Sequence, residues 1–441
     1  MITLEKIRIT VSIRGDSMEK YRARIIDTML GRKLKGKGAV LIEGPRWCGK
    51  TTTAEQISKS VLYMAKPEDK EQNVMLADIN PSLLLNGDVP RLIDEWQLAP
   101  KLWDAVRFEV DHRGEEGQFI LTESAVPANM DSVSHTGTGR FSWLTMRPMS
   151  LFESGESNGE ISLKELFLNP NKISALNSLS LEDIAFLCCR GGWPRSVFME
   201  RDIALEQAYD YYDAVINSDI SRVDGISRSP ERARNLMRSY SRNIGTQANN
   251  ETLRKDMIKN DSTSLDTDTV LSYVNALKRI FVVEESPAWN PNLRSKIATR
   301  TSDTRYFADP SIGVAALGMG PNDLINDLKT FGLMFESLCI RDLRVYAEAN
   351  NGKVYHYRDS SDLECDAVVY LRDGSYGLIE IKLGGDKLIQ EGAENLIKLY
   401  DKIDTETMKN PSFMMVITAT GNYAYKREDG VFVVPIGCLK D

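Results

Sequence analysis

Apolar positions in the first third of the chain gather into short, uninterrupted runs that alternate with helical patterns. The candidate strands are residues 39–43, 73–77, 91–94 and 118–122, and each run is bounded by polar or turn-forming residues. Such runs are typical of strands buried on both faces, and their alternation with helices favours a parallel sheet covered by helices on both sides. The first third therefore predicts an α/β domain.

The middle of the chain is mostly helical. A polar, Gly- and Ser-rich stretch at 154–160 is followed by helical patterns to about residue 225, interrupted by a turn at 191–194. Three further helical patterns lie between residues 228 and 285, and a pair of short apolar strands is expected around 281–283. Three helices followed by a hairpin predict a winged helix.

The clearest of these helical patterns is expected to span residues 267–279. Asp266 or Thr267 is suited to cap its first turn, because a short polar side chain can accept a hydrogen bond from a free backbone N–H there. The apolar positions recur at helical spacing: Val270, Tyr273, Val274, Leu277 and Phe281.

The last third changes period again and predicts a second, separate α/β domain. A helix is expected over 331–346, strands over 354–357, 365–370 and 377–383, a helix over 387–400, and a final apolar strand over 413–417. The expected organisation is an α/β domain with a helical extension at 20–225, a winged helix at 226–290 and the second α/β domain at 291–441.

Composition narrows the class of protein. The chain has 441 residues, a net charge of -8, six cysteines and three histidines. No apolar run approaches the roughly 20 residues of a membrane-spanning helix, and residues 1–16 lack the apolar core of a secretory signal. The cysteines form no C-x-x-C pair, which argues against a disulfide scaffold and a structural zinc site. We expect a cytoplasmic protein without a membrane partner. The negative charge argues against a wholly electrostatic nucleic-acid binder but leaves room for a local basic face.

The strongest chemical signal is the stretch from Gly44 to Thr51, which fits G-x-x-x-x-G-K-[ST] at every fixed position. It follows an apolar strand and precedes a helix, as a phosphate-binding loop must, whereas a chance Gly-rich turn would need neither neighbour. Gly44 and Gly49 allow backbone N–H groups to surround phosphates, Lys50 reaches the β- and γ-phosphates, and Thr51 can offer its hydroxyl to Mg²⁺. The predicted ligands are ATP and Mg²⁺, and Arg46 and Thr52 complete the predicted nucleotide-binding set.

A second carboxylate pair fits the same chemistry. The strand at 91–94 ends in Asp94 and Glu95, which we expect beside Mg²⁺ and beside the attacking water respectively. Thr122, at the end of the next strand, is the candidate polar group near the γ-phosphate, with Ser124 as the alternative. Arg140 is a candidate charge-stabilising arginine, although an arginine on a solvated face fits that position equally well.

Residues 20–200 resemble a prokaryotic family of AAA-type ATPases. The stretches that carry the resemblance are 42–52, 92–97, 119–122, 139–140 and 146–150. The resemblance implies a winged helix after the ATPase domain and a C-terminal domain of unknown function that is similar to restriction-endonuclease folds. One position departs from the family, which has Gly after the strand-end Thr where this chain has Glu123. A carboxylate there would oppose the phosphates unless it points away or the pocket is altered.

A second constellation lies in the last third. Glu380 and Lys382 share one face of a strand, because side chains alternate along a strand, and Asp366 begins the neighbouring strand. Glu336 on the preceding helix is a candidate fourth member. Carboxylates and a lysine around one cavity can bind Mg²⁺ for phosphodiester cleavage, and the D…E-x-K order resembles the restriction-endonuclease-like superfamily. A structural remnant without catalysis is the alternative.

DNA and protein are both candidate partners. In a winged helix the 267–279 helix would enter the major groove, yet Asp266 and Asp268 at its start would repel phosphates. Basic residues do gather nearby: Arg228, Arg232, Arg234, Arg238 and Arg242. The first hypothesis is an ATPase that couples hydrolysis to binding or processing nucleic acid. The alternative is a nucleotide-dependent switch whose C-terminal domains bind a protein partner, and a homo-oligomer is compatible with both.

Overall fold

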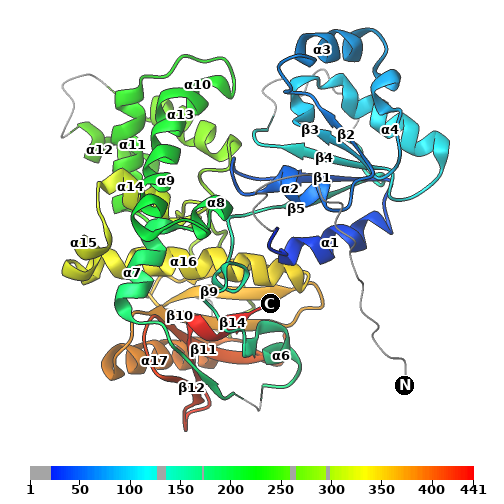
Figure 1. Ribbon diagram of the computed structural model, residues 1–441. Coiled ribbons are helices and arrows are strands. Elements are labelled where there is room, and N and C mark those ends of the chain that lie inside the picture. Colours follow the sequence, from blue (N-terminus) through cyan, green and yellow to red (C-terminus); the bar gives the residue numbers. More distant parts are fainter. Residues whose placement is uncertain (1–20, 127–135, 171–172, 259–264, 295–297) are drawn as a thin grey trace, which may run out of the picture.

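The computed structural model describes residues 21–126, 136–170, 173–258, 265–294 and 298–441. These residues form an N-terminal α/β region, a helical region and a C-terminal α/β region (Figure 1). The long helix α16 (Leu328–Ala349) lies between the helical region and the C-terminal sheet. In the described part of the chain, no helix is both long enough and apolar enough to cross a membrane.

The N-terminal region is a five-stranded parallel sheet with the order β2-β3-β4-β1-β5. Its strands are β1 (Ala39–Glu43), β2 (Ser60–Tyr63), β3 (Arg91–Asp94), β4 (Phe119–Glu123) and β5 (Phe141–Thr145). Its helices are α1 (Ile25–Leu34), α2 (Lys50–Glu55), α3 (Lys70–Ile79) and α4 (Lys101–Arg113). Because all strands are parallel, their carboxyl ends meet at one edge of the sheet, where the P-loop and the end of β3 lie.

One predicted strand of this sheet is wrong. Residues 73–77 belong to helix α3, in which only Ala77 is buried and Met75 is 59% exposed. A short apolar run does not by itself distinguish a strand from a helix that lies on the surface of a sheet. The strand that pairs with β3 at this edge is β2, a four-residue strand only partly buried.

The helical region packs around a single apolar core. Its helices are α7 (Leu181–Arg190), α8 (Pro194–Val197), α9 (Arg201–Ala214), α10 (Ile220–Arg222), α11 (Pro230–Arg242), α12 (Asn250–Ile258), α13 (Thr267–Arg279), α14 (Pro310–Leu317) and α15 (Pro321–Asn326). Helix α13 has the expected bounds, and the Asp266 side chain caps it by accepting a hydrogen bond from Thr269 N at 2.6 Å. The core includes residues on both sides of the expected boundaries at 225 and 290.

The hairpin expected around 281–283 is also wrong. These residues form no strand, and Val283 instead makes an isolated antiparallel bridge with Phe307. Ser286 and Thr304 make a second bridge, with both backbone hydrogen bonds at 2.9 Å. The intervening chain pairs with the edge of the C-terminal sheet, through Ala288 and His356. The segment that pairs with 282–286 is therefore 304–307, and the chain between these two segments passes the edge of the C-terminal sheet.

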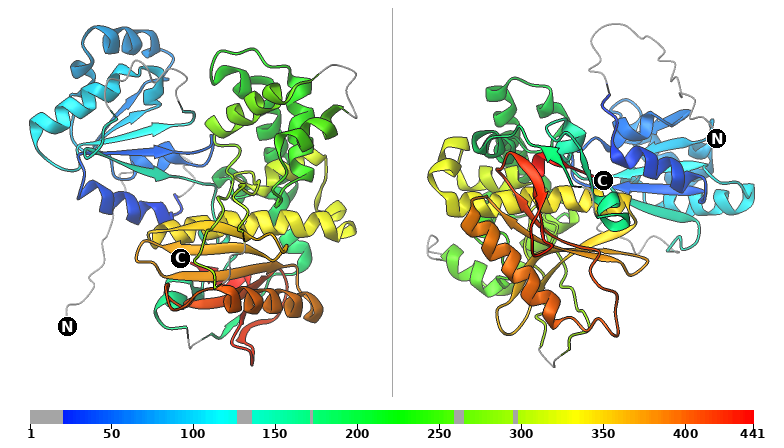
Figure 2. Two further views of the ribbon diagram at one scale, coloured as in Figure 1. Left: turned by 180° about the vertical axis from the view of Figure 1, so that it is seen from behind. Right: turned by 90° about the horizontal axis from the view of Figure 1, so that it is seen from below.

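The C-terminal region is a seven-stranded sheet with the order β7-β12-β13-β11-β10-β9-β8. Its strands are β7 (Ala175–Leu176), β8 (Gly352–Arg358), β9 (Glu364–Leu371), β10 (Tyr376–Lys382), β11 (Phe413–Thr418), β12 (Tyr423–Lys426) and β13 (Phe432–Pro435). Helix α16 lies against one face, and helix α17 (Asp386–Lys402) lies against the other (Figure 2). The predicted helices and strands of this region are present, and β7 adds an edge strand from a segment that precedes the helical region.

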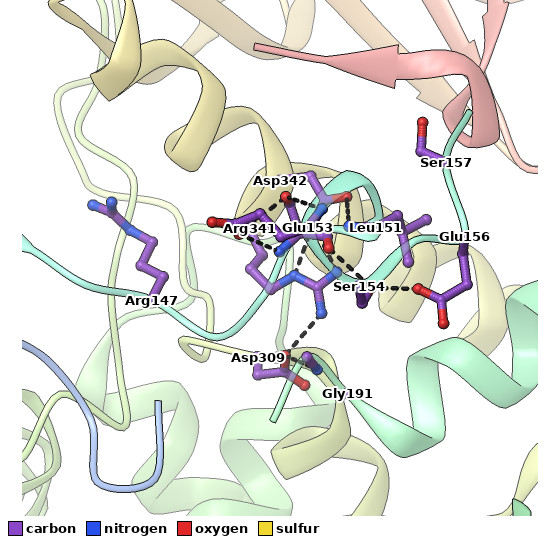
Figure 3. Close-up of polar contacts among 12 residues, drawn as sticks. Arg147, Leu151, Glu153, Ser154, Glu156, Ser157, Gly191, Asp309, Arg341 and Asp342 are labelled. Carbon is purple, nitrogen blue, oxygen red and sulfur yellow. Dashed lines mark hydrogen bonds and ion pairs between the residues drawn. The ribbon is translucent and has the colours of Figure 1, made fainter. Parts of the chain in front are cut away.

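A buried ionic cluster joins the three regions (Figure 3). Arg341 of α16 pairs with Asp309, which caps α14, at 2.9 Å and with its neighbour Asp342 at 2.7 Å. Asp342 also accepts a hydrogen bond from Leu151 N, at the start of helix α5 (Leu151–Ser154), at 2.9 Å. Arg147, which follows β5 and lies apart from this cluster in Figure 3, makes a second set of ion pairs, with Glu284 at 2.7 Å and Glu348 at 2.8 Å. The chain that leaves the N-terminal sheet is thus held by charged groups of the other two regions.

Candidate functional site

The P-loop connects β1 to α2 through backbone conformations that favour glycine. Gly44 has φ 150° and Gly49 has φ 101°. A Cβ at Gly44 would lie 2.1 Å from the carbonyl oxygen of Met146, so no other residue fits there without a shift of the backbone. Trp47 also adopts a positive φ, 66°, a conformation that costs a non-glycine residue roughly 1 kcal/mol or more. The P-loop therefore forms an arch between β1 and α2, and the first backbone N–H groups of α2 lie at the end of this arch that leads into the helix.

Lys50 is buried under the arch and directs its ammonium group to the loop itself. Its Nζ donates to the carbonyl oxygens of Gly44 at 2.9 Å and Pro45 at 2.8 Å. The side chain therefore already lies on the inner side of the loop, within reach of a phosphate group that the loop would surround.

Asp94, at the carboxyl end of β3, accepts hydrogen bonds from two hydroxyl groups. Thr51 Oγ1 donates to Asp94 Oδ1 at 2.6 Å, and Thr122 Oγ1 donates to the same oxygen at 2.7 Å. Thr122 Oγ1 in turn accepts a hydrogen bond from Glu95 N at 3.1 Å. A hydroxyl and a carboxylate in direct contact beside a P-loop form the oxygen pair that a hard divalent cation prefers.

Glu95 leaves the strand in a left-handed conformation, φ 57°, which turns its side chain into the cavity beside the P-loop. Its Oε2 accepts hydrogen bonds from Gln97 and, at 2.9 Å, from Ser124 Oγ. Thr122 is fully buried and holds the backbone of Glu95, whereas Ser124 lines the cavity. Both hydroxyl groups are buried, and of the two candidates only Ser124 is among the described residues that line the cavity.

The cavity in front of the P-loop has a volume of about 770 Å³, within the range of small-molecule sites. Gly49, Thr51, Thr52 and Glu95 are among the residues that line it. Its charged lining is strongly positive, with Glu95 as the sole carboxylate among the described lining residues. The basic residues are Arg22, Arg24, Arg46, Lys50, Lys70 and Arg195. A cavity with this charge suits a polyanion such as a nucleoside triphosphate.

Of the two arginines predicted near the phosphates, Arg46 lies at the cavity and Arg140 does not. Arg46 lines the cavity and pairs with Asp219 at 2.5 Å. Arg140 precedes β5 and pairs with Asp111 at 2.8 Å, at the end of α4. Because β5 is parallel to β1, Arg140 lies at the amino ends of the strands, opposite the P-loop. The prediction that Arg140 stabilises charge at this phosphate site is therefore wrong.

Glu123 lies behind the P-loop, side by side with Glu43 in the register of β4 and β1. It is 3% exposed, does not line the cavity, and its Oε2 accepts no hydrogen bond from the described residues. Burial, with a smaller contribution from Glu43, raises the pKa of Glu123 to about 8. Protonation removes the expected repulsion, because a carboxyl group with this pKa is mostly neutral near pH 7, and Glu123 does not line the cavity in front of the P-loop.

Three arginines that the sequence did not single out also border the cavity. Arg24 is buried and donates to the Cys48 carbonyl oxygen at 2.9 Å while pairing with Glu153 at 3.0 Å. Arg22 lies 5.2 Å from the centre of the Phe198 ring. Arg195 directly follows the turn at 191–194, and that turn is the only sequence signal that pointed toward it. The positions of Arg22 and Arg24 before α1 carry no motif.

The predicted C-terminal constellation does converge. Lys382 Nζ lies 2.6 Å from Glu380 Oε2 and 3.2 Å from Asp366 Oδ2. Asp366 Oδ2 also accepts the hydrogen bond of Ile381 N at 2.7 Å. Glu336 of α16 accepts a hydrogen bond from Tyr306 Oη. Glu380 is fully buried, and its Oε1 has no hydrogen-bond partner among the described residues.

The charges of this cluster are already balanced within it. Burial and then Asp366 raise the pKa of Glu336 to about 8 and raise the pKa of Glu380 well above its ordinary value. Burial opposes the charge of Lys382, but Asp366 and Glu380 outweigh it and raise the pKa of Lys382. Across the residues that the structure describes, no set of three or more His, Cys, Asp or Glu side chains is arranged to hold a metal ion.

The helical region also covers this cluster. Residues 245–247 and 304–306 lie over it, and the remaining cavity has a volume of about 30 Å³. A Cβ at Gly245 would lie 2.9 Å from Glu336 Oε1. That volume is enough for about one water molecule and is too small to enclose a phosphodiester group beside Glu336 and Asp366.

The basic residues expected to contact DNA are partly engaged within the protein. Arg228 is buried and pairs with Asp224 at 2.7 Å, and Arg242 pairs with Asp256 at 3.1 Å. Arg234 and Arg238 are exposed on α11. The end of α13 contacts the N-terminal region, because Val126 N donates to the Arg279 carbonyl oxygen at 2.9 Å.

Comparison with protein families divides the chain into three matched segments. Residues 36–154 match the AAA domain family, residues 181–323 match a domain of unknown function (DUF8612), and residues 331–439 match another (DUF4143). Together with the parallel sheet and the P-loop, the first match identifies the N-terminal region as an AAA-type P-loop domain.

Two uncharacterized proteins, from Mycobacterium bovis and Mycobacterium tuberculosis, are each 24% identical to this chain over 408 residues, which is 92% of this chain and 82% of theirs. A Walker-type ATPase of Pyrococcus abyssi is similar at 12% identity and a TM-score of 0.41, covering 66% of this chain and 94% of that one. RuvB of Thermotoga maritima gives 16% identity and a TM-score of 0.27, covering 59% of this chain and 89% of that one.

Proposed function

We propose that this chain binds ATP with Mg²⁺ at the P-loop and hydrolyses it. The observation that carries the proposal is the strongly basic cavity at the carboxyl edge of the AAA-type sheet, where Lys50, the Thr51–Asp94 pair and Glu95 meet. Bound Mg²⁺ would neutralise charge on the β- and γ-phosphates, and Thr51 and Asp94 are the residues that would hold it.

The side chains of the cavity have separate tasks in this mechanism. Lys50 exchanges the carbonyl oxygens of Gly44 and Pro45 for phosphate oxygens, which compensate its charge more fully. Glu95 accepts a proton from the attacking water, and Ser124 and Gln97 fix the orientation of its carboxylate. Thr122 keeps Asp94 and the backbone of Glu95 in register.

Two substitutions test this function. Lys50→Ala removes the charge on the β- and γ-phosphates and should weaken a micromolar affinity, about -8 kcal/mol, to near millimolar in calorimetry. Glu95→Gln keeps the size of the side chain but removes the base, so ATP should still bind while turnover falls roughly 100-fold or more. Unchanged ATP affinity in Lys50→Ala contradicts the binding site, and an unchanged rate in Glu95→Gln contradicts the role of Glu95.

The contacts between the P-loop domain and the helical region favour the switch as a second function over direct action on nucleic acid. Arg46 of the P-loop contacts Asp219, and Val126, two residues after Ser124, contacts Arg279 of the helical region. Arg228 and Arg242 already form ion pairs within the protein, which leaves fewer cations for DNA and is consistent with a protein partner of the C-terminal regions. The order of three helices, α11, α12 and α13, followed by two isolated antiparallel bridges supports the winged-helix interpretation, with distant segments in place of the hairpin expected around 281–283.

Fluorescence anisotropy with labelled DNA, at two salt concentrations and with or without ATP, discriminates the two functions. Salt-sensitive binding that depends on Arg234 and Arg238 would favour nucleic acid, and absence of binding would favour the switch.

The Asp366, Glu380 and Lys382 cluster stays a predicted metal site. Mn²⁺ titration of the wild type against Asp366→Ala tests it, because a site in the C-terminal region should bind the ion without ATP.

A further inference from the structure

The side chain of Arg46 is held in the cavity by a residue from outside the AAA-type domain. Arg46 Nη1 lies 2.5 Å from Asp219 Oδ1, and the two residues are 173 positions apart in the chain. The Arg46 side chain is 48% exposed, whereas that of Asp219 is only 10% exposed. The carboxylate is therefore the fixed member of the pair, and the guanidinium is the member that faces the open cavity.

Asp219 lies on a local distortion of a helix. The segment Val215–Asp219, between α9 and α10, is a π-helical turn. Such turns are uncommon and often occur at functional sites, because the extra residue changes the direction of a side chain. The adjacent α9 carries Tyr211, whose ring lies 5.9 Å from that of Trp47 and stacks on Trp193 at 4.3 Å. Two consecutive P-loop side chains therefore contact the same helical segment.

Arg46 lines the cavity next to the residues that Lys50 contacts. Lys50 Nζ, which is expected on the β- and γ-phosphates, reaches Gly44 and Pro45, the residues directly before Arg46. Tyr21 and Thr53 also line the cavity, and Tyr21 Oη lies 2.9 Å from Thr53 Oγ1, one helical turn into α2. A triphosphate that runs along the loop thus has its terminal group near Arg46, Lys50 and Glu95.

The geometry of the pair leaves Arg46 able to bind a second anion. A guanidinium group has five N–H donors, and Asp219 uses only Nη1. Within the described part of the chain, Nε and Nη2 of Arg46 make no hydrogen bond. Arg222 is the other basic residue whose charge acts on Asp219. One carboxylate can therefore orient the planar fork while the other nitrogens stay available to an anion in the cavity that Arg46 lines.

We propose that Asp219 is a positioning residue that aims Arg46 at the terminal phosphate of ATP, so that the helical region supplies part of the recognition of the triphosphate. The inference rests on the proposed ATPase function and deepens it, since it assigns discrimination between ATP and ADP to one ion pair. A ligand that moves the π-helical turn would therefore change the affinity for ATP. Because linkage is reciprocal, ATP would change the affinity for that ligand by the same factor.

The test is a double-mutant cycle with Arg46→Ala, Asp219→Ala and the double variant. ATP and ADP affinities are measured by calorimetry, and kcat and KM by phosphate release. Asp219→Ala should weaken ATP binding roughly 5- to 10-fold, the effect of a partly solvated charge-assisted hydrogen bond, and leave ADP affinity unchanged. Arg46→Ala should weaken ATP binding at least as much, and the double variant should match Arg46→Ala alone.

Controls separate this role from a structural one. Asp219→Asn keeps the shape and removes the charge, so it should reproduce the loss without lowering the melting temperature. Asp210→Ala removes an exposed carboxylate of α9 and should leave both affinities unchanged. Equal losses for ATP and ADP, or additive effects of Arg46→Ala and Asp219→Ala, would overturn the proposal. Failure of the proposed function itself is distinct, because the wild type would then bind no ATP or Lys50→Ala would bind it equally well.

Discussion

Glu123 provides a quantitative test of the electrostatics behind the P-loop. Burial raises the pKa of this carboxyl group from 4.5 to about 8. The folded state therefore retains a proton that the unfolded state loses above pH 4.5, and stability contributed by this group falls as pH rises from 4.5 to 8. At ~1.4 kcal/mol per pKa unit, the penalty reaches about 3 kcal/mol at pH 7 and about 5 kcal/mol above pH 8. The side chain is 3% exposed, so solvent screens this penalty little.

Glu123→Gln replaces the carboxyl group by a neutral group of the same shape. The variant should nearly match the wild type at pH 5, exceed it in stability increasingly up to about pH 8, and keep a constant advantage from there to pH 9. Urea unfolding followed by tryptophan fluorescence measures the difference, and Trp96, whose side chain acts on the pKa of Glu123, serves as a local reporter. Glu43, which also has a raised pKa because of burial, is present in both proteins.

The matched control is Glu116→Gln, which removes an exposed carboxylate from the loop before β4. Its stability difference from the wild type should not change with pH. A constant difference between Glu123→Gln and the wild type from pH 5 to pH 9 would refute the reasoning, because it would mean that Glu123 ionises normally in the folded protein.

Two further substitutions test the positions of charged side chains. Arg140→Ala should leave the ATPase rate unchanged and change the stability little, because it breaks only an exposed ion pair with Asp111; a large loss of rate would contradict its position at the opposite edge of the sheet. Arg341→Met leaves Asp309 and Asp342 buried without their cation and should destabilise the protein by about 3–5 kcal/mol in denaturant unfolding. Burial, partly offset by Arg341, raises the pKa of Asp342 to about 6, so the loss should be smaller at pH 5 than at pH 8, and an equal loss at both values would argue against the charge.

The local signals of the sequence determined the P-loop site and much of the secondary structure. Gly44 and Gly49, a preceding apolar strand and a following helix specify the phosphate loop because few residues permit those backbone conformations. The strand that ends in Asp94 and Glu95, and the capped helix α13, were likewise predicted correctly, because capping and apolar periodicity are local properties. The convergence of Asp366, Glu380 and Lys382 followed from strand alternation.

Tertiary structure alone decided the remaining features, because they depend on which distant segments meet. Helix α3 has an apolar run that suits either state, and only its place outside the sheet makes it helical. The sequence around Arg140 fits either a charge-stabilising arginine or a solvated one, and the direction of β5 decides it by placing Arg140 at the edge opposite the P-loop. The pairing of Arg46 with Asp219 and the burial of Glu123 have no sequence signal, since each depends on contacts between segments far apart in the chain. The sequence determines which side chains are present, and contacts between distant segments decide the protonation of Glu123 and the orientation of Arg46.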